Sequence, residues 1–262
     1  MFRSSNPTLK EGLFSDASVL SDGQVMTIQG AVNKTLIMLL LLIAAAAWVW
    51  MGVMPLIQAS QQGAAAVAAA QGRGIALPFA FGGAIVGFIL AMVISFKPQW
   101  SGYLAPVYAI AEGFFIGGIS AFIEFMYPGI VMQATLLTFA TLFCLLMAYK
   151  TGIIRVTEKF RLGIFVATAA IMVIYLINMV MGFFHASMPF IAGGGFWGIA
   201  FSMVVVGIAA LNLVLDFDLI ERGAESGAPK YMEWYSGFAL MVTLVWLYIE
   251  ILNLLMKLRS RD

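Results

Sequence analysis

Seven apolar runs, each about 20 residues long, constrain this chain more than any other feature of its sequence. At about 1.5 Å of rise per residue, a helix of that length crosses the roughly 30 Å hydrocarbon layer of a bilayer. The runs show no alternation of polar and apolar residues, so we expect helices and not a barrel. The predicted spans are residues 36–57, 75–96, 103–123, 130–149, 162–184, 196–215 and 238–256. The chain is therefore predicted to be an all-α, polytopic membrane protein with seven transmembrane helices.

The composition excludes the other broad classes. Hydrophobic residues make up 62% of the 262 residues and charged residues only 10%, with a mean hydropathy of +0.98. Soluble domains carry about 25% charged residues, which they need for a water-facing surface. The single cysteine, Cys144, falls within a predicted span, which excludes an intrachain disulfide. The net charge of +1 gives no reason to expect a nucleic-acid partner.

The predicted layout is a polar N-terminal tail at 1–35, a seven-helix domain at 36–258 and a basic C-terminal tail at 259–262. With the N-terminus in the cytoplasm, ten Lys and Arg residues lie in inner segments and one in the outer loops, which favours this orientation. Three more basic residues follow the seventh span and would lie outside. Either the early helices fix the topology, or the last segment is re-entrant and returns to the inner face.

Glycines recur at four-residue spacing within the predicted spans, as in the pairs Gly83 and Gly87 or Gly113 and Gly117. Small residues at this spacing let helix backbones approach closely in a membrane. A tight intramolecular bundle accounts for the pattern without a dimer. The segment 58–74, rich in Ala, Gln and Gly, is expected to form the first outer connection.

Acids within the spans are the candidate functional residues, because an ionisable group in a bilayer is costly. Glu112 lies in the third span and Glu250 in the seventh, while Asp216 follows the sixth at its inner end. No Lys or Arg is predicted in the core of any span, so protons or metal cations are the natural partners of these acids. Asp218 sits at the inner interface, about 200° around the helix from Asp216.

Two carboxyls that meet in a bilayer cannot both ionise cheaply, so they would share a proton and titrate as a unit. Such a pair would act as a pH-sensitive latch that holds two helices together until both groups are charged. The doubly charged pair would separate or draw in a divalent cation. Calcium, which prefers several oxygen ligands, would suit such a site.

The sequence predicts no enzyme. It has no HExxH motif, and one histidine cannot form a two-histidine zinc site. Gly118-Ile119-Ser120 loosely resembles the turn of an intramembrane serine protease, but the only histidine, His185, falls in or beside an outer loop. No cofactor is expected, apart from calcium as a permeant or bound ion.

The last two spans carry a resemblance to a known family. They read LNLVLDFDLIERG at Leu211–Gly223 and LYIEILNLL at Leu247–Leu255, and the third span carries Glu112-Gly113. These motifs, seven helices and an inward N-terminus resemble the Bax inhibitor family, also called the transmembrane BAX inhibitor motif family. The run EWYSGFALMVTLVWLYIEIL and the tail opening near Asn6-Pro7-Thr8-Leu9 resemble its bacterial branch, which implies the bacterial plasma (inner) membrane.

The resemblance implies six helices around a central seventh and a proton-sensitive calcium leak. The family's paired carboxyls would be Asp216 and Glu250, which are also the expected calcium ligands, with Glu112 along the ion path. Lys97 is the nearest counterpart of a basic residue that supports the latch in some relatives, and Asp218 could join it. Glu250 stands where the family pattern has Asp. The two acids also lie at different depths in straight, level helices, so the seventh helix would have to shift or bend for them to meet.

Two other functions remain open at this point. The chain could be a regulatory partner of a membrane protease or another integral complex, with the polar N-terminal tail as its contact. It could also be a proton-coupled transporter, although the sequence shows no internal repeat of the kind common in transporters.

Overall fold

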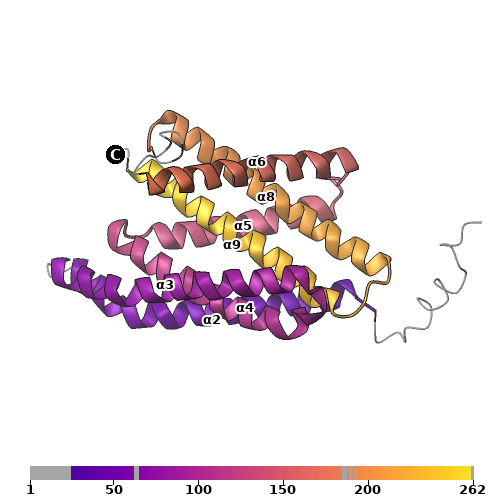
Figure 1. Ribbon diagram of the computed structural model, residues 1–262, viewed down its shortest axis with the longest axis horizontal. Coiled ribbons are helices and arrows are strands. Elements are labelled where there is room, and N and C mark those ends of the chain that lie inside the picture. The colour runs from indigo at the N-terminus through magenta and orange to yellow at the C-terminus, as the bar shows by residue number, and fades with distance from the viewer. Residues whose placement is uncertain (1–24, 62–64, 185–187, 189–190, 192, 261–262) are drawn as a thin grey trace, which may run out of the picture.

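Seven long helices make up the computed structural model, which describes residues 25–61, 65–184, 188, 191 and 193–260 (Figure 1). All seven are long and apolar enough to cross a membrane, which confirms the predicted all-α class and number of spans. The helices are α2 (Ile28–Gln61), α3 (Ala65–Phe96), α4 (Ser101–Met126), α5 (Ile130–Lys150), α6 (Glu158–Phe183), α8 (Phe196–Glu225) and α9 (Met232–Arg259).

Several helices are longer than the apolar runs that predicted them. The side-chain oxygen of Thr27 accepts a hydrogen bond from the backbone N–H of Gly30 at 2.9 Å, so α2 begins eight residues before the predicted span. Helices α2 and α3 also extend through most of 58–74, because alanine favours helix more than the scattered glycines oppose it. The rest of the predicted tail, residues 1–24, lies outside the described residues.

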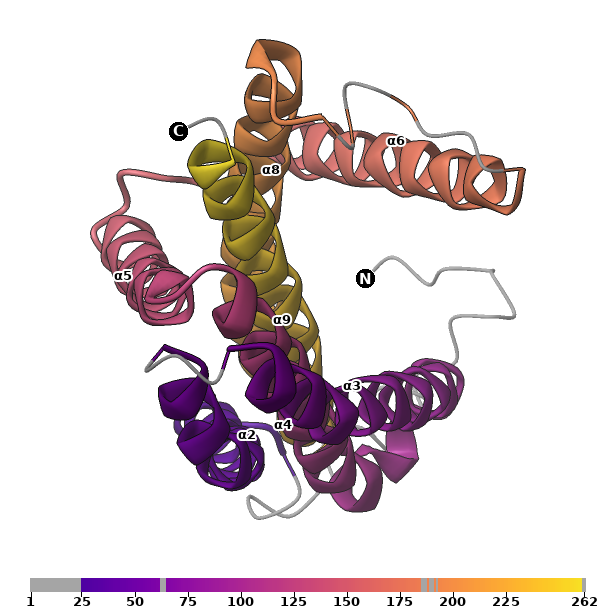
Figure 2. The ribbon, with the colours of Figure 1, turned by 90° about the vertical axis from the view of Figure 1, so that its left-hand side faces the viewer.

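Helix α9 occupies the centre of the molecule. It packs against α2, α4, α5 and α8, and Figure 2 shows it in yellow crossing between these helices. Its buried residues come from every turn, whereas α6 has only two fully buried residues and packs mainly on α8. The predicted position of the seventh helix at the centre is therefore confirmed.

Helices α2, α3 and α4 form the most closely packed part of the bundle. A Cβ added to Gly113 of α4 would lie 2.7 Å from the Cβ of Ala45 in α2, and one added to Gly118 would lie 2.5 Å from the backbone nitrogen of Ala80 in α3. Side chains larger than glycine would push these backbones apart. The glycines thus serve packing within one chain, as the sequence suggests.

The two ends of α9 lie on opposite sides of the bundle. At one end, the backbone N–H of Met26, just before α2, donates to the carbonyl of Ala228, just before α9, at 2.7 Å. At the other end, the guanidinium of Arg259 donates to the carbonyl of Pro128 in the α4–α5 turn at 3.2 Å. Helix α9 therefore crosses the bundle completely and is not re-entrant. We call the side where α2 begins the N side.

Candidate functional site

Asp216 lies on α8 and faces α9. Its carboxylate interacts with Thr243 of α9, while its Oδ2 atom is buried and has no hydrogen-bond partner. Buried polar atoms are nearly always satisfied, because leaving one unpaired forfeits its hydration without replacement. The free oxygen marks Asp216 as a group able to hold a proton or a cation.

Glu250 lies on α9, with a side chain only 3% exposed. Its Oε1 atom accepts hydrogen bonds from the hydroxyl of Tyr175 at 2.8 Å and from the indole N–H of Trp246 at 3.2 Å. Its Oε2 atom is buried without a partner. One oxygen is therefore fixed by two donors, and the other is left free.

A cavity of about 370 Å³ adjoins Glu250 between α4, α6 and α9. Three of its lining residues besides Glu250 are polar: Tyr175 and Asn178 from α6, and Asn253 from α9. The amide of Asn178 also accepts a hydrogen bond from the backbone N–H of Met188 at 3.1 Å, which fixes its position. The cavity is mainly apolar but places these three polar side chains near Glu250, and it is large enough for water.

The structure keeps Asp216 and Glu250 apart. Asp216 faces Thr243, which precedes Glu250 by seven residues, or about 10 Å along α9. No hydrogen bond joins the two carboxyls among the described residues, and each has its own polar partners. The difference in depth expected from the sequence is therefore present, and neither a shift nor a bend of α9 removes it.

Glu112 occupies a third environment, between α4 and α3. It is 8% exposed, interacts with Tyr108 one turn earlier on α4, and has an unpartnered Oε2 atom. A Cβ on Gly87 of α3 would come within 2.7 Å of its Oε1 atom, so Gly87 makes room for the carboxylate. Glu112 thus shares the free oxygen of the other two acids but is not brought together with them.

Asp218 and Lys97 lie at the ends of helices, away from these acids. Asp218 binds Arg161 at 2.6 Å and Arg222 at 2.9 Å, so it faces a charged network on the N side, as its rotation from Asp216 predicts. Lys97 is exposed and lies 4.6 Å from the ring centre of Trp100. Neither residue contacts Asp216 or Glu250 in this structure.

Polar residues follow one another along α9 at seven-residue intervals. Ser236, Thr243, Glu250 and Lys257 are all 9% exposed or less, and this spacing places them on one stripe of the helix. Thr243 meets Asp216 of α8, and Lys257 meets Ser202 of α8. The central helix therefore carries a buried polar stripe along its whole length.

Comparison with known families agrees with these motifs. The family model described as Bax inhibitor 1 like matches residues 6–260, nearly the whole chain. The chain belongs to the Bax inhibitor 1 like family. No curated protein and no solved structure gives a significant match. The family resemblance noted from α8, α9 and Glu112-Gly113 is confirmed.

One buried acid of this Bax inhibitor 1 like protein was not singled out from its sequence. Glu233, in the first turn of α9, is completely buried. It pairs with Lys34 of α2 and with Lys230 at 3.1 Å, and it accepts hydrogen bonds from the backbone N–H and hydroxyl of Thr27, both at 3.0 Å. Its position outside the predicted span is typical of a solvent-exposed residue. Lys230, three residues earlier, is the one sequence feature that could have predicted an ion pair with Glu233.

Lys257 was expected to follow the seventh span, but it is buried near the end of α9. It is 6% exposed, and its ammonium donates to the hydroxyl of Ser202 at 2.8 Å and to the carbonyl of Gly198 at 3.3 Å. The apolar run appeared to end at residue 256, but α9 continues to Arg259 beside the start of α8. The polar stripe thus ends in a cation on the side opposite the N side.

The described residues contain no group of three or more His, Cys, Asp or Glu side chains that could hold a metal ion together. Calcium usually takes six to eight oxygen ligands, several of them carboxylates. Asp216 faces Thr243, seven residues before Glu250 on α9, so the two acids do not form such a ligand group among the described residues.

Proposed function

We propose that this membrane protein is a pH-sensitive calcium leak and not an enzyme, with Asp216 and Glu250 as its sensing carboxyls. The observation that carries the proposal is that each acid has one buried carboxylate oxygen beside α9 with no hydrogen-bond partner among the described residues. Such an oxygen can exchange between a proton and a cation at little structural cost, because no protein donor has to be displaced. Family membership supports the calcium leak through the resemblance described above.

The separation of the two acids changes how the gate is proposed to work. They lie apart in this conformation, and each has its own partners: Thr243 for Asp216, and Tyr175, Trp246, Asn253 and the ammonium of Lys257 for Glu250. Loss of either proton places a charge on the interface of α9, at α8 for Asp216 and at α6 for Glu250. We propose that these charges loosen α9 from its neighbours and admit calcium, with Glu112 as a further carboxylate beside α3.

Calcium efflux from proteoliposomes over a range of pH tests this proposal. The native protein is expected to pass calcium with a steep dependence on pH, while Asp216→Asn and Glu250→Gln each remove one titrating group and make that dependence shallower or shift its threshold. Glu225→Gln makes the same chemical change at an exposed position at the end of α8 and should leave the curve unchanged. A folded native protein that passes no calcium at any pH would overturn the leak.

In that event, regulation of another integral membrane protein through the N-terminal tail becomes the favoured function. Deletion of the tail then tests regulation, and it should stop at residue 24. Thr27, Gly30 and Lys34 belong to the contact with Glu233, so a longer deletion would damage the fold. Strictly coupled movement of protons and a solute would instead indicate a transporter.

A further inference from the structure

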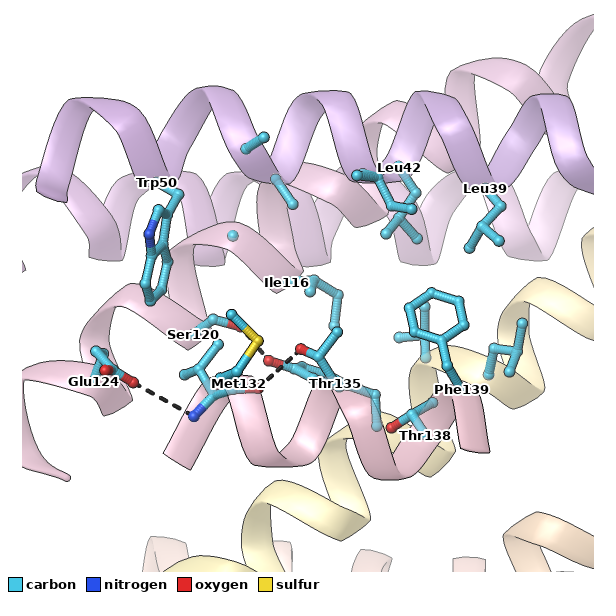
Figure 3. Close-up of a pocket in the computed structure, with 18 of the residues that line it drawn as sticks. Leu39, Leu42, Trp50, Ile116, Ser120, Glu124, Met132, Thr135, Thr138 and Phe139 are labelled. Carbon is cyan, nitrogen blue, oxygen red and sulfur yellow. Dashed lines mark hydrogen bonds between the residues drawn. The ribbon is translucent and has the colours of Figure 1, made fainter. Parts of the chain in front are cut away.

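An apolar groove of about 490 Å³ runs along the bundle between α2 and α5. Its floor comes from α4 and from α9, including Ile116 and Val245. Figure 3 shows Leu39, Leu42 and Trp50 of α2 facing Met132, Thr135 and Phe139 of α5 across this space. All four helices are long and apolar enough to cross a membrane and the groove is lined mainly by apolar side chains, so we expect it to face lipid.

The groove is longer along α2 than along α5. On α5 its lining runs from Val131 to Phe139, about 12 Å, and on α2 from Leu39 to Met54, about 22 Å, compared with about 15 Å for half of the hydrocarbon layer. It begins next to the α4–α5 turn, which lies on the side opposite the N side. Glu124 and Trp50 lie at this end, while Leu39 and Phe139 lie at the deep end (Figure 3).

The hydroxyl and carboxylate groups that line the groove are satisfied within the protein. Ser120 and the hydroxyl of Tyr248 bond to each other at 2.7 Å. The hydroxyls of Thr135 and Thr138 each donate to a carbonyl one turn earlier on α5, both at 2.8 Å. Glu124 accepts from the backbone N–H of Gly129 at 2.6 Å. A molecule bound in the groove would therefore make apolar contacts and would not need to form hydrogen bonds with these groups.

We propose that this groove binds one acyl chain of a phospholipid from the leaflet opposite the N side. A helix about 10 Å across that followed the lining of α2 for about 22 Å would fill about 1,700 Å³, more than three times the groove, so a helix of a second copy fits less well than a single hydrocarbon chain. The polar end of the groove lies where the chain would join its headgroup. Filling the groove removes a void that would otherwise cost dispersion energy along four helices.

The occupant would touch the central helix on the side away from Glu250. Met241, Leu244, Val245 and Tyr248 of α9 line the groove, and Tyr248 lies about 200° around α9 from Glu250. A bound acyl chain therefore supports the side of α9 that faces α2 and α5. This inference concerns lipid binding and stands whether or not the protein conducts calcium.

Two alanines of α2 provide a matched test. Ala47 is exposed and lines the groove, whereas Ala44, one turn earlier, is exposed but does not line it. The full-length protein and its Ala47→Phe and Ala44→Phe variants would be reconstituted with phosphatidylethanolamine and phosphatidylglycerol, extracted in detergent, and measured by native mass spectrometry. Native protein and Ala44→Phe are expected to retain one phospholipid, and Ala47→Phe to lose it.

Equal phospholipid retention by all three proteins, or none by the native protein, would overturn the proposal. A dimer that only Ala47→Phe disrupts would also overturn it, since a second copy would then be the occupant. If Ala47→Phe does not fold, as judged by circular dichroism, Ala47→Leu replaces it with a smaller side chain. Quenching of Trp50 by phospholipid with brominated chains provides a second measurement, expected to fall in the groove-filled variant and not in Ala44→Phe.

Discussion

Glu233 and Glu250 lie on the same helix and are both buried, but their surroundings differ. Glu233 has two lysines and two donors from Thr27 around its carboxylate, so both of its oxygens are engaged. Glu250 has two neutral donors on one oxygen and no hydrogen bond on the other among the described residues, although Asn253 and the ammonium of Lys257 also interact with its carboxylate. The first arrangement fixes a permanent negative charge, whereas the second leaves a group that can change its protonation or its partner.

The comparison separates an anchor from a sensor by what surrounds each carboxylate and not by burial alone. Glu233 ties the start of α9 to the start of α2, where Met26 also bonds to the α8–α9 connection. Glu250 lies 17 residues further along the helix, beside a cavity that also contains Tyr175, Asn178 and Asn253. If this distinction is correct, substitutions at the two sites should move different observables.

Glu233→Gln should cause the largest loss of stability. Removing one member of a buried ion pair typically costs about 3–5 kcal/mol, and the lower end applies here because Lys230 is half exposed and can turn toward water. Denaturant titration in mixed micelles would measure the change in free energy of unfolding. The pH dependence of calcium efflux should keep the slope of the native protein; a flatter curve would make Glu233 a sensor as well.

Gly30→Ala should weaken the same anchor from the opposite helix. A Cβ at this position would collide with the carboxylate of Glu233, which its three partner residues hold in place, so we expect a loss of about 1–3 kcal/mol. Gly52→Ala on the same helix is the control. Nothing lies within 4 Å of its added Cβ, and alanine at that site should be neutral or stabilising in the same titration.

Asp218→Asn should have a smaller effect, about 1 kcal/mol, because its partners Arg161 and Arg222 are partly exposed and screened by solvent. The loss should shrink as the salt concentration rises, which unfolding at low and high ionic strength would show. An effect independent of salt would mean that the network is more deeply desolvated than its exposure indicates.

Glu250→Gln should alter stability by less than about 1 kcal/mol, because the amide oxygen can still accept from Tyr175 and Trp246. Its effect should instead appear in the pH dependence of calcium efflux, as proposed above. Glu233→Gln is therefore expected to change stability and not efflux, and Glu250→Gln to change efflux and not stability. A large loss of stability without a change in efflux would show that Glu250 is also an anchor.

Lys97→Ala should have the smallest effect, at most about 0.5–1 kcal/mol from the contact with Trp100. The threshold and slope of calcium efflux should stay those of the native protein, since no carboxylate among the described residues pairs with Lys97. A shifted pH threshold of efflux would mean that Lys97 interacts with Asp216 or Glu250 in a second conformation of the protein.

Much of the fold could be predicted because an apolar run of about 20 residues in a membrane can form little other than a spanning helix. The seven runs predicted seven helices, and the motifs around Asp216 and Glu250 predicted the family and the central place of α9. The ends of the helices were less predictable. Thr27 begins α2 before its apolar run, and α9 continues through Lys257 because Ser202 and the carbonyl of Gly198 satisfy the ammonium.

The sequence by itself determined the class of protein and which residues are costly to place in a bilayer, because both follow from hydropathy and charge along the chain. Only the tertiary structure decided which acids meet which partners, because contact depends on the packing of helices far apart in sequence. It keeps Asp216 opposite Thr243, Glu250 beside Tyr175 and Glu233 between two lysines. The sequence indicated which acids would be buried, whereas the hydrogen-bond partners of each carboxylate oxygen depend on residues that folding brings next to it.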